Sequence, residues 1–173
     1  MRRWMVTGWW VVLVGVTVQT SWAEPPVFMS PDWARQACEA WNQDPVLTKE
    51  LHESGWIEND KGRGYKVLQL YRSDCPNDPW VELKIQNVDG KATCTYGGAV
   101  TQKPDLSVDY IMHAKTYRWE QMGQGEYGPM WGMMTGRLKF QGPKWEAMKN
   151  MGPFENFLLL MGKVPSNMKQ CNR

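Results

Sequence analysis

The sequence lacks the patterns that would indicate catalysis. Its 173 residues include only two histidines, His52 and His113, and no H-E-x-x-H or G-x-S-x-G motif. Gly62 and Gly64 are typical of a turn, because no phosphate-loop lysine and hydroxyl residue follow them at the required spacing. A nucleophile, a base and oxyanion donors cannot be assembled from these residues. We therefore predict a protein that is not an enzyme and that uses no cofactor and no metal.

The sequence also has no long apolar run. Residues 9–18 are uncharged and apolar, but this run is about half of the roughly 20 residues that a spanning helix needs. Arg2 and Arg3 precede it and Ser21-Trp22-Ala23 follows it, as in an export signal. We predict a cleaved signal peptide over residues 1–23 and a mature chain, residues 24–173, in the periplasm or outside the cell. An uncleaved membrane anchor is the alternative.

No charge of one sign dominates the mature chain. Basic and acidic residues balance once Arg2 and Arg3 are removed. A nucleic-acid binder needs a basic face, and strong docking on an anionic membrane needs clustered cations. The balance therefore predicts no nucleic-acid partner and no more than transient membrane contact, and it identifies no protein partner.

The four cysteines lie far apart, without a C-x-x-C motif, so a zinc, haem or redox-dithiol site has little support. They are Cys38, Cys75, Cys94 and Cys171. An even number in an exported chain favours two disulfides. Three pairings are open and the spacing does not choose between them. Four reduced cysteines, or one bond and two buried thiols, are the alternatives.

Apolar residues have helical spacing towards both ends of the mature chain and strand spacing between them. Ser30-Pro31 and Asp44-Pro45 are helix starts. Strands are predicted over residues 65–73, 81–86, 91–96, 106–112 and 137–141, and antiparallel pairing is the default for the first four because most of their connections are short. Helices are predicted over residues 117–122 and 127–135, and from Pro143 and Pro153 onward. Helices segregated from a sheet predict an α+β domain.

The second predicted strand has one apolar and one polar side. Val81, Leu83 and Ile85 alternate with polar or charged residues, which predicts one buried and one solvated face. Asp89-Gly90 predicts a tight hairpin to the next strand. Asp109 lies on the polar side of the fourth predicted strand, where we expect a solvated carboxylate.

The last third of the chain carries a more specific signal. Strand residues 107–112 precede a short helix around Trp119 and a second helix at residues 130–134. Residues 135–142, Thr-Gly-Arg-Leu-Lys-Phe-Gln-Gly, then match a strand motif of the form sGklkikG. Helices around Met148 and Phe157 complete the order. In these features residues 108–162 resemble the sterol carrier protein 2 family, and a looser resemblance covers residues 31–162.

This resemblance implies a five-stranded, mainly antiparallel sheet covered by helices, with a hydrophobic tunnel between the sheet and the C-terminal helices. It implies one domain over residues 24–173, with a core at 31–162 and a polar tail at 163–173. Members of the family bind sterols, fatty acyl chains or phospholipids and catalyse nothing. The chain departs from well-known members in its export signal, its four cysteines and its 12 methionines and 11 tryptophans.

The expected function is binding, and transfer, of a sterol, hopanoid, fatty acyl chain or phospholipid. Methionine suits a wall that accepts ligands of variable shape, although a stripe of methionine and aromatic residues is often ordinary core. The predicted lipid contacts are Trp119, Met122, Trp131, Met134, Phe140, Met148, Phe157 and Met161. Two alternatives are an accessory subunit that presents a lipid-like substrate or quinone to a membrane enzyme, and a glycan binder that uses exposed tryptophans.

Overall fold

A computed structural model describes residues 24–172, so the predicted signal peptide lies outside the described residues. Five strands form one sheet in the order β3-β2-β1-β4-β5. The strands are β1 (Lys66–Arg72), β2 (Val81–Val88), β3 (Lys91–Ala99), β4 (Tyr110–Ala114) and β5 (Lys139–Gln141). All pairings are antiparallel except that of β1 with β4. The predicted α+β class and mainly antiparallel sheet are confirmed.

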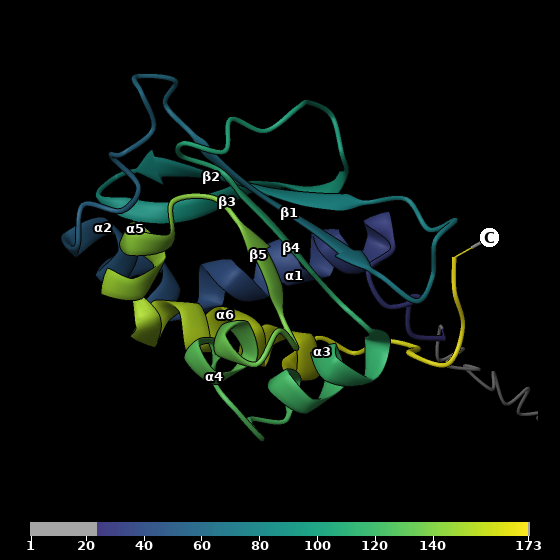
Figure 1. The fold of residues 1–173 in the computed structure, drawn as a ribbon. Coiled ribbons are helices and arrows are strands. Elements are labelled where there is room, and N and C mark those ends of the chain that lie inside the picture. The colour runs from purple at the N-terminus through teal and green to yellow at the C-terminus, as the bar shows by residue number, and fades with distance from the viewer. Residues whose placement is uncertain (1–23, 173) are drawn as a thin grey trace, which may run out of the picture.

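Helices cover one face of this sheet (Figure 1). They are α1 (Pro31–Gln43), the π-helical turn η1 (Val46–Glu50), α2 (Leu51–Glu53), α3 (Thr116–Gly123), α4 (Pro129–Met134), α5 (Lys144–Lys149) and α6 (Met151–Lys163). Val81, Leu83 and Ile85 alternate along β2 as predicted, and all three are fully buried. The solvated face expected opposite them is wrong at Glu82, which is also fully buried because it accepts hydrogen bonds from Gln69 and from Thr101 of the segment that crosses this face. Among residues 24–172, none of the helices combines the length and apolar character needed to cross a bilayer.

The connection from β3 to β4 corrects the expected pairing of the fourth strand. Residues 100–109 cross the outer face of the sheet, where the Gln69 side-chain amide donates to the Gln102 carbonyl at 2.8 Å. This crossing brings β4 to the far side of β1, where the two strands run parallel. The antiparallel default was wrong here because the connection is a long crossover rather than a tight hairpin. The strand also begins at Tyr110 rather than at Leu106, which lies in a turn and is 41% exposed.

Two disulfides join distant segments, which confirms the predicted number of bonds. Cys38 of α1 is bonded to Cys94 of β3, and Cys75 is bonded to Cys171. Close packing accompanies the first bond: a Cβ atom at Gly97 of β3 would lie 2.2 Å from the Ala34 carbonyl oxygen of α1. Glycine is therefore required where this helix meets the sheet.

The predicted polar tail is tied to the rest of the molecule, and the core extends beyond residues 31–162. Phe28 and Val164 are buried, and the Phe28 amide donates to the Asn167 carbonyl at 3.0 Å. The Arg72 guanidinium donates to the Gln170 carbonyl at 2.9 Å. Hydrogen bonds and the Cys171 disulfide thus order a segment whose own residues are mostly polar.

Candidate functional site

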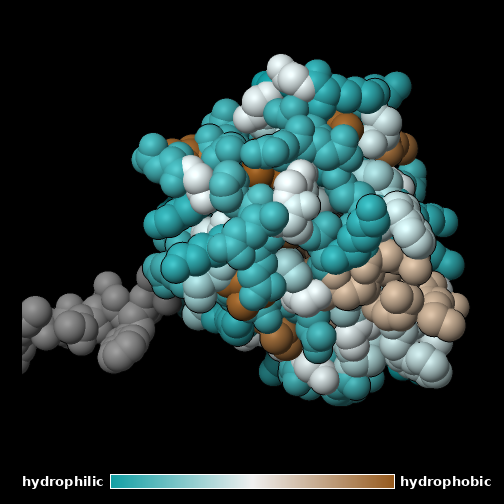
Figure 2. Space-filling view, turned by 90° about the vertical axis from the view of Figure 1, so that its left-hand side faces the viewer, coloured by the Kyte–Doolittle hydropathy of each residue, from teal (hydrophilic) through white to brown (hydrophobic). Residues whose placement is uncertain are grey.

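An apolar groove opens between α4, β5 and α5. It has a volume of about 480 Å³. Its apolar lining consists of Met130, Met133, Met134, Leu138, Phe140 and Met148. We call it the methionine groove. Met130, Met134 and Met148 are exposed at the surface. Figure 2 shows an apolar patch low on one side of the molecule. A second hollow of about 290 Å³ adjoins the methionine groove and shares Met130 and Met134.

The local sequence leaves the side chains of α4 exposed. Pro129 starts this helix, which has only six residues. The chain turns out of it at Gly136, whose φ of 68° favours glycine. A helix this short is stable only through what it packs against. On the side of α4 that faces the core, Gly132 packs against Leu138. Met134 lies on the opposite side of α4, and its side chain is consequently 74% exposed.

Aromatic rings lead from the methionine groove into the core. The ring of Phe140, on β5, lies 5.4 Å from that of Tyr110 on β4 and 5.7 Å from that of Phe154 on α6. Tyr110 is stacked on Trp56 at 6.0 Å. These rings pack in series from the wall of the groove into the core.

A polar cluster, which we call the Lys66 cluster, lies at the inner end of this aromatic series. The fully buried Lys66 ammonium donates to a Glu146 carboxylate oxygen at 2.7 Å and to the Trp56 carbonyl at 3.1 Å. The Tyr110 hydroxyl donates to the same carboxylate oxygen and accepts from the Trp56 indole N–H at 2.8 Å. Asn59 donates to the other carboxylate oxygen at 2.7 Å.

Burial dominates the electrostatics of the Lys66 cluster. Desolvation lowers the pKa of Lys66, and the hydrogen bond to Glu146 opposes that shift. Burial, together with the carboxylate of Glu146, raises the pKa of Tyr110 far above its ordinary value. The sequence analysis missed this cluster, because Lys66 and Glu146 are 80 residues apart and neither stands in a motif.

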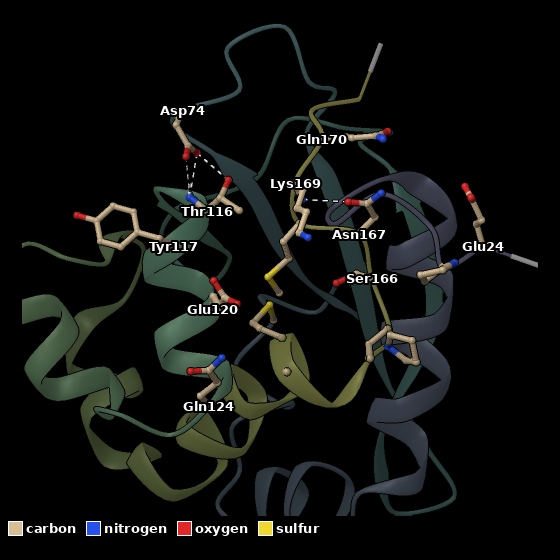
Figure 3. Close-up of a pocket in the computed structure, with 16 residues that line it drawn as sticks. Glu24, Asp74, Thr116, Tyr117, Glu120, Gln124, Ser166, Asn167, Lys169 and Gln170 are labelled. Carbon is tan, nitrogen blue, oxygen red and sulfur yellow. Dashed lines mark hydrogen bonds between the residues drawn. The ribbon is translucent and has the colours of Figure 1, made fainter.

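A third, larger hollow of about 940 Å³ lies beside the C-terminal tail and is lined by both polar and apolar side chains (Figure 3). At its edge the carboxylate of Asp74 accepts hydrogen bonds from the backbone and the hydroxyl of Thr116, at 2.9 to 3.0 Å. Asp74 therefore caps α3, whose preceding residue Lys115 provides no side-chain cap. This capping gives Asp74 a structural role at the edge of the hollow.

Comparison with known proteins adds an independent finding. Residues 59–155, more than half of the chain, match the SCP-2 sterol transfer family. The chain belongs to the SCP-2 sterol transfer family. The resemblance inferred from residues 108–162 is thereby confirmed. No curated protein matches the sequence.

Solved structures similar to this SCP-2 family member share its fold. A crystal structure of sterol carrier protein 2 has a TM-score of 0.51 and 14% identity, and the match covers 79% of this chain and 98% of that one. The solution structure of a conserved hypothetical protein from Thermus thermophilus, described as a candidate sterol carrier protein, has a TM-score of 0.50 and 16% identity. That match covers 84% of this chain and 94% of the other.

In this SCP-2 family member, the eight predicted lipid contacts fall into two groups. Met134, Phe140 and Met148 line the methionine groove, and Trp131 lines the adjoining hollow. The other four are at most 1% exposed, and their contact with a ligand stays a prediction. Trp119, Met122 and Phe157 lie within the core, and Met161 also lines the third hollow.

Six further residues line the groove but were not among the predicted contacts: Met130, Met133, Gly136, Leu138, Lys139 and Lys144. Met130 and Met133 share the helical stripe of Met134, which is the signal that could have found them. The two lysines carry no such signal, since exposed lysine is common on any surface.

Proposed function

We propose that the protein binds the apolar body of a lipid in the methionine groove and transfers it without catalysing a reaction. The ligand would be a sterol or hopanoid, a fatty acyl chain or a phospholipid. The observation that carries this proposal is the groove itself, whose lining is mainly methionine and phenylalanine and whose Phe140 ring packs against Tyr110 of the core. Membership of the SCP-2 sterol transfer family supports it.

The size and chemistry of the groove suit such a ligand. Its volume of about 480 Å³ falls in the range of small-molecule sites, roughly 300–1,000 Å³. Burying a chain of about 16 carbons would contribute on the order of 12 kcal/mol, at about 0.8 kcal/mol per methylene. Immobilisation of the ligand and ordering of side chains cost at least several kcal/mol of this. The remainder supports micromolar or tighter binding.

The groove can be tested with Met134→Asp and Met148→Asp. We expect each variant to bind a fluorescent fatty acid and a fluorescent sterol about tenfold or more weakly, because a carboxylate in an apolar site must be desolvated. Both positions are exposed in the unliganded protein, at 74% and 44%, so the variants should fold. Fluorescence titration measures the affinities.

The matched control is Leu106→Asp, on the other side of the sheet, where the side chain is 41% exposed. It should bind both probes as the wild type does. Equal affinities for all three variants and the wild type would refute lipid binding in the methionine groove. Phe157→Asp is a poorer test, because Phe157 is 1% exposed and its charge would disrupt the core.

We also propose that the mature chain is a single domain in the periplasm or outside the cell. The two disulfides support an oxidising compartment. The expected result is an intact mass for exported protein that corresponds to a chain beginning at Glu24. A mass that includes residues 1–23 would contradict cleavage.

Glycan binding is a second candidate, favoured by one observation on the outer face of the sheet. Trp80 is 40% exposed and stacked on Tyr71 at 4.1 Å, and Tyr71 is stacked on His113 at 4.4 Å. Burial, with a smaller contribution from the charge of Lys139, lowers the pKa of His113, so its ring is favoured in the neutral form. Such a platform could present an indole face to a sugar. Quenching of tryptophan fluorescence by glycans, and not by lipids, would favour this function.

A further inference from the structure

We propose that the Lys66 cluster is a binding site for the carboxylate of a long-chain acid and that Glu146 occupies this site until the ligand replaces it. The ligand's carboxylate would accept the hydrogen bonds that Lys66, Tyr110 and Asn59 now donate to Glu146. Its apolar tail would remain in the methionine groove. This inference rests on the proposed function and narrows its ligand to an acidic amphiphile.

The first argument is the position of Lys66. Its side chain is fully buried on the helix-covered face of β1, where an uncompensated ammonium is costly. The ring faces of Trp56 and Tyr110 lie 4.5 and 5.3 Å from its Nζ atom and favour a cation there. An ammonium in these surroundings requires an anion, and any carboxylate of suitable reach satisfies the requirement.

The second argument is that the present anion is carried by a weakly attached helix. The six residues of α5 include one buried residue, Ala147, and the helix has no side-chain N-cap. Trp145 and Met148 on its outer faces are 69% and 44% exposed. Glu146, which is 14% exposed, provides the polar attachment of this helix to the sheet. A helix so short has little stability of its own.

The third argument is the space on both sides of α5. The methionine groove, on one side, is lined by Met148. A hollow of about 320 Å³ on the other side is lined by Trp56, Glu146 and Asn150. Thus α5 is the wall between two hollows, and its displacement would join them around the Lys66 cluster. The packed rings of Phe140 and Tyr110 lie between the groove and this cluster.

A competing arrangement places the carboxylate at the mouth of the groove, where Lys139 and Lys144 are exposed. Exposed ion pairs contribute little to affinity, because water and salt screen them. A carboxylate at the mouth would also leave Glu146 on Lys66 and α5 in place. If the carboxylate binds at the buried site, the protein should bind an acid much more tightly than its ester. If it binds at the mouth, the difference in affinity should be small and should disappear at high salt.

The test compares a fluorescent polyene fatty acid with its methyl ester, which has the same tail and no charge. We expect the wild type to bind the acid more tightly than the ester. In Glu146→Gln a neutral amide replaces the resident anion, so the affinity for the acid should rise by about tenfold or more while that for the ester changes little. Unchanged or lower affinity for the acid in this variant would overturn the proposal.

Two further variants separate the site from its alternatives. Lys66→Met with Glu146→Gln removes both charges together, which avoids leaving one buried charge unpaired. It should bind the ester as the wild type does and should lose the preference for the acid. Lys144→Met should keep that preference. Loss of the preference in Lys144→Met alone would place the carboxylate at the mouth and overturn the proposal.

The outcomes also distinguish this proposal from the proposed function. Equal binding of acid and ester by the wild type, weakened by Met134→Asp, would overturn the carboxylate site and leave lipid binding in the groove intact. Failure of the wild type to bind either probe would instead contradict the proposed function, and the carboxylate site with it.

Discussion

Replacing Arg72 with methionine is expected to lower the free energy of unfolding by about 3–5 kcal/mol, because it leaves the buried carboxylate of Asp78 without its counterion. The side chains of Arg72 and Asp78 are 1% and 3% exposed, and the guanidinium donates two hydrogen bonds to one carboxylate oxygen. A third donor of the guanidinium binds the Gln170 carbonyl. Urea denaturation, followed by tryptophan fluorescence, measures the loss.

The matched control is Lys163→Met, which removes an ion pair at the surface. The side chain of Lys163 is 54% exposed and its Nζ lies 3.5 Å from Asp44. Exposed pairs contribute about 0–1 kcal/mol, so this variant should unfold close to the wild-type midpoint. If Arg72→Met were no less stable than Lys163→Met, the buried pair would not stabilise the fold as argued.

The second large effect is expected from the Cys75–Cys171 disulfide. Replacing both cysteines with serine should lower the free energy of unfolding by about 2–5 kcal/mol, because the bond restricts an unfolded chain across a sequence separation of 96 residues. The double variant should also loosen the tail, which increases amide hydrogen exchange at residues 164–172. Denaturation and hydrogen exchange with mass spectrometry measure the two effects.

The disulfide and the buried ion pair should be coupled. Gln170 and Asn172 flank Cys171, and they contact Arg72 and Asp78 respectively. Residues that share contacts give non-additive changes in stability. When the cysteine double variant is combined with Arg72→Met, the loss in free energy of unfolding should therefore be smaller than the sum of the two separate losses. The other disulfide, Cys38–Cys94, lies between α1 and β3 and provides the control, since its removal should leave exchange in the tail unchanged.

Much of the fold could be predicted from local spacing. The alternation of Val81, Leu83 and Ile85 identified the buried face of β2, and Asp89-Gly90 identified its hairpin with β3. Proline and capping residues located the start of α1, where Ser30 accepts from the Trp33 amide at 3.2 Å. Motif order in the last third indicated the family, which the family match confirms. These features depend on neighbours in sequence, and so the sequence reveals them.

The candidate site was predicted in part. The methionine stripe pointed to Met134 and Met148, which line the groove, but equally to Met122 and Met161, which lie in the core. Helical spacing shows that one face is apolar, and it does not show whether another element covers that face. The short length of α4 and the position of α5 decide this.

By itself, then, the sequence determined the class of fold, the family and the even number of cysteines available for bonding. Tertiary structure alone decided the parallel pairing of β1 with β4, the choice among three disulfide pairings, and the meeting of Lys66 with Glu146. Asp109 shows the same limit: strand alternation predicted a solvated carboxylate, yet it is fully buried against Arg63 at 2.7 Å. These four features of the tertiary structure have the same physical reason. Spacing along a chain sets which face of an element is buried, whereas pairing across the fold depends on how crossovers and close packing bring distant segments together.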